Sequence, residues 1–92
     1  MKRVVTRGVM EKIDFFLQII MWNMVEKIPS PKDYLQVFEF ENQNGQLKIT
    51  HSQEQPEYKK EYLLKMDAPF YVGKIFVIDD ETHITMLLAE EY

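Results

Sequence analysis

The stretch that decides the fold is IDFFLQIIMWNMVEKI, which runs from Ile13 to Ile28. Its apolar side chains recur every three or four residues, the spacing that places them on one face of an α-helix. Asp14 suits the N-cap or the first turn, and Pro29 with Pro31 ends the pattern because proline cannot continue a helix. The sequence therefore predicts one amphipathic helix, with a core-facing stripe of Ile13, Phe16, Leu17, Ile20, Met21, Met24, Val25 and Ile28.

The same helix carries a second apolar stripe, formed by Phe15, Ile19 and Trp22. These residues lie roughly opposite the first stripe. A helix that is apolar on two sides is either buried on both or presents one side to a partner. Phe15, Ile19 and Trp22 are therefore a candidate interface. A homodimer or partner contact and burial under the N-terminal arm are both open.

The segments around the helix have the patterns of strands. Residues 4–13 indicate a short strand or an extended arm that bends at Gly8. Beyond the helix, residues 34–41 and 46–53 flank Asn44-Gly45, which is a strong signal for a β-hairpin. Both flanking segments alternate between two faces, as strand residues do.

The last third of the chain predicts three further strands. The segment EYKKEYLLKM, residues 57–66, fits either a strand or a helix, and its strand-rich neighbourhood favours the strand. Residues 75–78 and 83–90 are apolar and β-branched on either side of the turn-like residues 79–82. The expected fold is α+β: one amphipathic helix packed on a mostly antiparallel sheet of about five strands, in a single compact domain over residues 1–92.

Composition limits the classes of protein that the chain can be. It has 92 residues, a net charge of −4 and no cysteine, so disulfides, thiolate metal sites and a cysteine nucleophile are excluded. The N-terminus does not have the pattern of a signal peptide, and the most apolar run, residues 15–22, is too short to cross a bilayer. We expect a cytoplasmic location and no membrane contact. The basic residues 1–12 and the acidic residues 75–92 suggest pairing within one fold or between two copies.

Motifs for catalysis and metal binding are weak. The chain has two histidines, so a three-histidine zinc site is impossible within it. The acidic turn, residues 79–83, offers oxygen ligands for a cation but lacks EF-hand spacing, and a solvated turn is expected instead. Ser52 follows His51 directly, so on a strand the two side chains point to opposite faces. We therefore predict no catalytic residue, no metal and no cofactor.

The polar string ITHSQEQPEYKKEY, residues 49–62, is the candidate binding surface. Its tyrosines and lysines alternate in a way that can stack nucleic-acid bases, although the net negative charge argues against nucleic acid. The hypothesis that we favour is a non-enzymatic protein-interaction or regulatory module with an unknown protein partner. A single-stranded nucleic-acid-binding domain, and a small-molecule binder or carboxylate-based enzyme, are the alternatives. The residues expected on this surface are His51, Gln53, Glu54, Tyr58 and Lys60.

Four blocks of the sequence together resemble a small family of Firmicutes proteins, domain of unknown function number 960. The blocks are TRG (6–8), LQVFEF (35–40), ITHSQEQPEYKKEY (49–62) and KIFVIDDETHITMLLAEEY (74–92). The resemblance runs from about Val4 to Tyr92. It implies a compact cytoplasmic protein and carries over no activity, ligand or catalytic residue.

Two features depart from what the resemblance leads us to expect. The helix is more apolar, so Phe15 and Ile19 mark a contact particular to this chain. Glu81 stands in the D-D-E-T-H turn where glycine is expected. This second departure puts in doubt any cation site at the turn.

Overall fold

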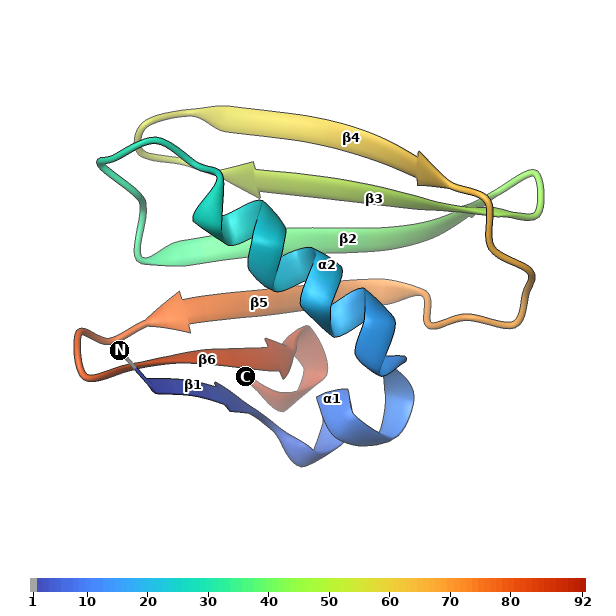
Figure 1. The fold of residues 1–92 in the computed structure, drawn as a ribbon, viewed down its shortest axis with the longest axis horizontal. Helices are drawn as coiled ribbons and strands as arrows, with labels where there is room; N and C mark the ends of the chain where they lie inside the picture. The colour runs from blue at the N-terminus through green and yellow to red at the C-terminus, as the bar shows by residue number, and fades with distance from the viewer. Residues whose placement is uncertain (1) are drawn as a thin grey trace.

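The main helix, α2 (Phe15–Glu26), forms where the sequence predicts it. Asp14 is its N-cap, because the Asp14 carboxylate accepts a hydrogen bond from the backbone amide of Phe16 at 3.1 Å. The computed structural model describes residues 2–92 and places α2 obliquely across one face of a β-sheet (Figure 1). The helix ends ahead of Pro29 and Pro31, as expected.

The sheet has six strands rather than about five, in the order β1-β6-β5-β2-β3-β4. All neighbours are antiparallel except β1 and β6, which are parallel. The α+β class is therefore confirmed, with one more strand than expected. The strands are β1 (Lys2–Val5), β2 (Leu35–Gln43), β3 (Gln46–Gln53), β4 (Tyr58–Leu64), β5 (Gly73–Asp79) and β6 (His83–Leu88), and a short 3₁₀ helix, η1 (Ala89–Glu91), follows them.

The strand predictions for the second half of the chain are confirmed. Asn44 and Gly45 form the tight turn between β2 and β3, and both have positive φ, 54° and 86°. Two positive φ values match the twist of a hairpin, which is why Asn-Gly is favoured there. The ambiguous segment 57–66 contains a strand, β4, and residues 79–82 join β5 and β6 as a hairpin.

The prediction of an extended arm is wrong beyond Val5. After β1 the chain forms a second helix, α1 (Arg7–Lys12), which Thr6 caps by accepting a hydrogen bond from the Val9 amide. Val9 is fully buried, and its burial stabilises a helix too short to persist alone. Gly8 therefore lies inside a helix and does not mark a bend in an arm.

The buried face of α2 is rotated relative to the predicted stripe. Phe16 is 61% exposed, whereas Gln18 and Trp22 are 6% and 9% exposed. Gln18 faces inward because its side-chain amide donates to the backbone carbonyl of Ile13 at 3.0 Å, where α1 ends. The core also includes Leu17, Met21, Met24 and Val25 of α2 with Phe38, Phe40, Leu47, Ile49, Ile75, Val77, Met86 and Leu88 of the sheet.

The basic start and acidic end of the chain meet within one fold. The Lys12 ammonium lies 3.2 Å from the Glu90 carboxylate. Glu91 accepts hydrogen bonds from the Thr6 hydroxyl and the Gly8 amide at 2.6 and 3.1 Å. Within residues 2–92, no helix has both the length and the apolar character required to cross a membrane.

Candidate functional site: a buried polar network and an apolar helix ridge

His51 is a core residue and not part of a surface. Its exposed fraction is 0%, and its ring stacks on Phe38 with centroids 4.3 Å apart. The Nε2 atom of His51 lies 2.7 Å from the side-chain oxygen of Gln36. Since that oxygen is an acceptor, Nε2 carries the proton, and Nδ1 is buried without a hydrogen-bond partner among the described residues.

The surroundings of His51 favour its neutral form. A proton on Nδ1 would place a positive charge in the core with no acceptor to receive it. Burial therefore lowers the pKa of His51 from 6.5 to about 4. A group of this kind is uncharged at neutral pH, and its contacts are those of a packed core side chain.

Gln53 is also buried, and it joins His51 to the loops at this end of the sheet. Its side-chain oxygen accepts from the Gln36 amide group at 2.6 Å and from the Asp33 backbone amide at 3.1 Å. Its own amide group donates to the Pro56 carbonyl at 2.7 Å. The prediction that His51 and Gln53 belong to a binding surface is therefore corrected: both are linked through Gln36 in a buried network.

Asp33 holds the outer part of this network. Its carboxylate accepts from the backbone amides of Gln55, Leu35 and Glu54 at 3.0, 3.3 and 3.3 Å. These bonds, that from Gln55 first, hold the pKa of Asp33 below its ordinary value. Asp33 thus ties the start of β2 to the turn that leads into β4. Neither Asp33 nor Gln36 stands in a motif, so no pattern in the sequence indicates their role.

A hollow of about 320 Å³ lies at the end of the sheet, and Glu54, Tyr58 and part of Gln53 line it. His51 and Lys60 do not line it. Lys60 points instead along β4, where its ammonium lies 6.0 Å from the centre of the Tyr58 ring. The five predicted residues are thus divided between the core, this hollow and the edge of the sheet.

Tyr58 anchors β4 to the core. Its ring meets the His51 ring edge-on, with centroids 5.3 Å apart, while Lys60 lies over it. This arrangement corresponds to a half-buried anchor with a lysine beside it. The ring is therefore used within the fold, to hold β4 against the core.

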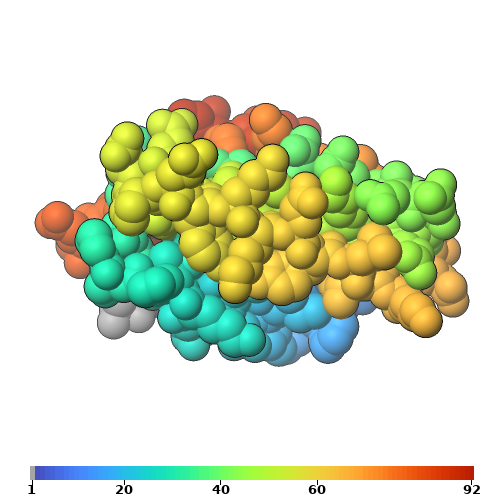
Figure 2. Space-filling model, turned by 90° about the horizontal axis from the view of Figure 1, so that it is seen from above, coloured from blue at the N-terminus to red at the C-terminus, as the bar shows by residue number. Residues whose placement is uncertain are grey.

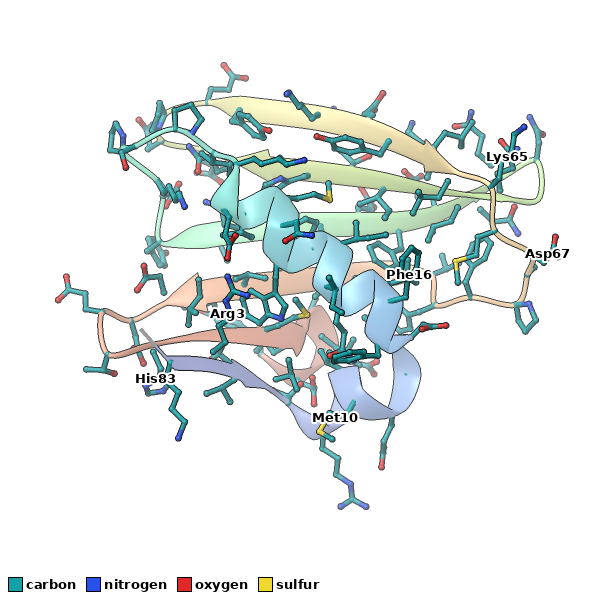
Figure 3. All side chains as sticks on the ribbon, in the orientation of Figure 1. Arg3, Met10, Phe16, Lys65, Asp67 and His83 are labelled. Atoms are coloured by element: carbon teal, nitrogen blue, oxygen red, sulfur yellow. The ribbon has the colours of Figure 1, made fainter. Side chains whose placement is uncertain are left out.

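The candidate interface on α2 is divided by the structure. Phe15 and Ile19 are exposed, by 70% and 42%, but Trp22 is buried. The guanidinium of Arg3, which reaches from β1, lies 5.1 Å from the centre of the Trp22 ring and also pairs with Glu26 (Figure 3). The prediction is therefore corrected for Trp22, because the strand at the N-terminus covers it.

Phe16 takes the place of Trp22 on the exposed side. It is 61% exposed and projects from the N-terminal half of α2 (Figure 3). Phe15, Phe16 and Ile19 together are called the α2 ridge below. A hollow of about 300 Å³ lies beside the ridge, lined by Phe15, Met10, Ile13, Val5 and Gln18. The sequence pattern missed Phe16 because its spacing fits the core stripe.

In the acidic turn, residues 79–83, the aspartate side chains accept hydrogen bonds from backbone amides of the turn itself. Oδ1 of Asp80 accepts from the backbone amides of Thr82 and His83 at 3.0 and 2.9 Å, and the bond from His83 is the main reason that the pKa of Asp80 is low. Oδ1 of Asp79 accepts from the Glu81 amide at 2.9 Å. Over residues 2–92, no three His, Asp or Glu side chains gather as a metal site would require.

Comparison with known proteins places the chain in a family without giving it an activity. No curated protein matches it. A crystal structure of a protein of unknown function from Enterococcus faecalis has the same fold, with a TM-score of 0.83 and 24% sequence identity. The match covers 99% of this chain and 90% of that one. A family model described as "Staphylococcal protein of unknown function (DUF960)" matches residues 2–91. The chain therefore belongs to the DUF960 family.

Proposed function

We propose that this protein is a non-enzymatic interaction module that binds a partner protein through the α2 ridge. The observation that carries the proposal is the exposure of Phe15, Phe16 and Ile19, by 70%, 61% and 42%, on a helix whose other side is in the core. Exposed aromatic clusters of this kind are typical of binding surfaces. The proposal includes a cytoplasmic location, which the absence of cysteine suits.

The hollow beside the ridge indicates the chemistry of the partner. Met10, Ile13 and Val5 line it together with Phe15, so it suits an apolar side chain. A protein segment that inserts one such side chain and lays a second against Phe16 would cover most of the ridge. We therefore expect a partner segment with apolar residues at helical or alternating spacing.

Two further observations support a binding role over the alternatives. His51 and Gln53 are occupied by the buried network, so the most reactive side chain of the polar string is turned away from the surface. The Tyr58 ring packs edge-on against His51 and so holds β4 to the core, which is a structural use of that ring. Neither observation favours an enzyme or a nucleic-acid-binding domain.

The test is cross-linking from defined positions in cells that produce the protein. A photoreactive amino acid at Phe15 should give a discrete adduct with another protein. The matched control carries the photoreactive amino acid in place of Lys74, which is exposed on β5, away from the ridge. The partner identified in this way should bind the purified protein, and Phe15→Ser with Ile19→Ser should abolish that binding. Identical adducts from both positions, or none from Phe15, would contradict the proposal.

A further inference from the structure

The strand β4 forms one edge of the sheet, and its outer side is open. Among residues 2–92 it pairs with β3 only, and residues 59–63 are all exposed. Figure 2 looks onto this edge and shows β4 running across the front of the molecule with no segment over it. The strand has seven residues and contains neither proline nor glycine. An open, regular edge of this length can accept a further strand by backbone hydrogen bonding.

The sheet geometry shows which β4 residues face outward. Successive residues of an antiparallel strand direct their backbone groups to opposite neighbours. The backbone bond from Asp79 to Tyr34, 2.9 Å long, shows that even-numbered positions of β2 face β5. The odd-numbered residues of β2 therefore bond to even-numbered residues of β3, and the odd-numbered residues of β3 bond to even-numbered residues of β4. The backbone groups of the even-numbered residues of β4 thus point toward β3. The residues with outward backbone groups are therefore Lys59, Glu61 and Leu63.

We infer that β4 pairs antiparallel with β4 of a second copy of this chain, around a two-fold axis at Lys60. In this register Lys59 lies opposite the second copy's Glu61, and Glu61 lies opposite the second copy's Lys59. Both are hydrogen-bonded pairs, so the outward backbone groups and the opposite charges are satisfied together. On the face that carries α2, Tyr58 lies opposite the second copy's Tyr62, which forms an aromatic pair on each side of the axis.

Charge selects this register over its neighbours. A two-fold axis at Glu61 sets Glu61 against itself. An axis at Lys59 sets Lys59 against itself and Glu57 against Glu61. Like charges directly opposite one another destabilise a pair of strands. The axis at Lys60 also sets one like pair, Lys60 against itself, whose ammonium leans over Tyr58. Of the three axes it alone forms two pairs of opposite charge within β4, Lys59 with the second copy's Glu61 on each side of the axis. The occupant that best fits this edge is therefore a second copy.

Charge exchange tests the pairing by sedimentation velocity over a range of protein concentrations. The unmodified chain should sediment with twice the mass of one chain at high concentration. Lys59→Glu should weaken the dimer about tenfold or more, because it creates two like pairs. Lys59→Glu combined with Glu61→Lys should restore it. Glu61 also pairs with Lys48 within one chain at 3.4 Å, but the restoring variant loses that contact too, so rescue reports the contact between copies.

Cysteine trapping tests the position of the axis, and the chain has no cysteine of its own to interfere. Lys60→Cys places two thiols opposite one another at a non-hydrogen-bonded position, where the separation suits a disulfide. Oxidation should therefore give a covalent dimer from Lys60→Cys and little from Glu61→Cys. All of these positions are exposed, so the fold should persist, which circular dichroism checks.

The inference is independent of the α2 ridge. Phe15→Ser should leave the dimer unchanged, and failure of the cross-linking from Phe15 would not affect it. A chain that is monomeric at millimolar concentration would overturn the inference. A dimer that Lys59→Glu does not weaken, or that is trapped through Glu61→Cys in place of Lys60→Cys, would overturn it as well.

Discussion

The carboxylate of Glu91 accepts a hydrogen bond from the backbone amide of Gly8, at 3.1 Å and across 83 residues of sequence. The same carboxylate accepts from the Thr6 hydroxyl at 2.6 Å and from the Leu88 amide at 2.8 Å. These bonds, that from Thr6 first, lower the pKa of Glu91. A single side chain thus joins the start of α1 to the end of β6, and Gly8 is the residue that leaves space for it.

Gly8→Ala should destabilise the protein although it places alanine in a helix. A Cβ atom at position 8 would lie 2.5 Å from the Glu91 carboxylate oxygen, so the carboxylate must move away from the helix and loses the hydrogen bond from the backbone amide at position 8. We expect the free energy of unfolding to fall by about 1 kcal/mol, measured by urea denaturation. In a protein that already carries Glu91→Ala, Gly8→Ala should raise the free energy of unfolding by up to about 1 kcal/mol, because alanine is favoured over glycine in a helix. Equal effects in both backgrounds would refute the coupling.

Stability should depend on pH through His51. Its pKa is lowered from 6.5 to about 4, so the unfolded chain binds the proton more tightly than the folded one. Neutral His51 therefore makes its full contribution to the free energy of unfolding above pH 6.5, and this contribution is lost as the pH falls from 6.5 to about 4. The full loss is about 3 kcal/mol. Urea denaturation at several pH values between 7.5 and 4.5 measures it.

The control for this prediction is His51→Phe, which keeps a ring against Phe38. The variant loses the bond to Gln36 and should be less stable at pH 7.5, but its stability should change little between pH 7.5 and 5. The pKa values of the Asp33, Asp80 and Glu91 carboxylates are lowered by their hydrogen bonds, which moves their titration away from neutral pH. An unchanged slope in His51→Phe would show that another group is responsible.

Trp22 and Phe15 should respond very differently to truncation. Trp22→Ala should lower the free energy of unfolding by about 3–5 kcal/mol, because a large core side chain is removed and Arg3 loses the ring beneath it. Phe15→Ala should change it by no more than about 0.5 kcal/mol, since the side chain is 70% exposed. Thermal or urea denaturation followed by circular dichroism compares the two. Similar losses in both variants would contradict the observed packing of α2.

Glu81 occupies a position that suits glycine. Its φ is 78°, in the left-handed region that is unfavourable for residues with a side chain. Glu81→Gly should therefore raise the free energy of unfolding by about 0.5–1 kcal/mol. Glu81→Ala is the matched control, because it removes the same charge and keeps the Cβ atom. If alanine stabilises the protein as much as glycine does, charge and not backbone strain is the cause.

Local patterns allowed several elements to be predicted. The apolar spacing of residues 13–28 predicted a helix, Asp14 its start and Asn44-Gly45 a tight turn, and these local elements are present although the buried side of the helix differs. The absence of glycine from the turn at Glu81 was noticed from the sequence alone. Its physical meaning, a strained φ, required the backbone geometry.

The candidate site could be predicted only in part. The sequence drew attention to His51, Gln53 and Tyr58, and these residues do lie close together. Their partners Gln36 and Asp33 come from other segments, and no spacing in the sequence connects them. The polar composition of residues 49–62 therefore predicts a surface, whereas His51 and Gln53 form their hydrogen bonds in the interior.

The sequence by itself determined α2 and the hairpin of β2 and β3, because helix capping, helix hydrogen bonds and tight turns depend on neighbouring residues. It did not determine α1, a helix too short to persist without the burial of Val9. Tertiary structure alone decided which side of α2 is buried. The helix crosses the sheet obliquely (Figure 1). Gln18 turns inward to meet the end of α1, and β1 brings Arg3 over Trp22. Burial depends on which distant segments cover a side chain. The periodicity of a single helix therefore could not distinguish Trp22 in the core from Phe16 on the ridge.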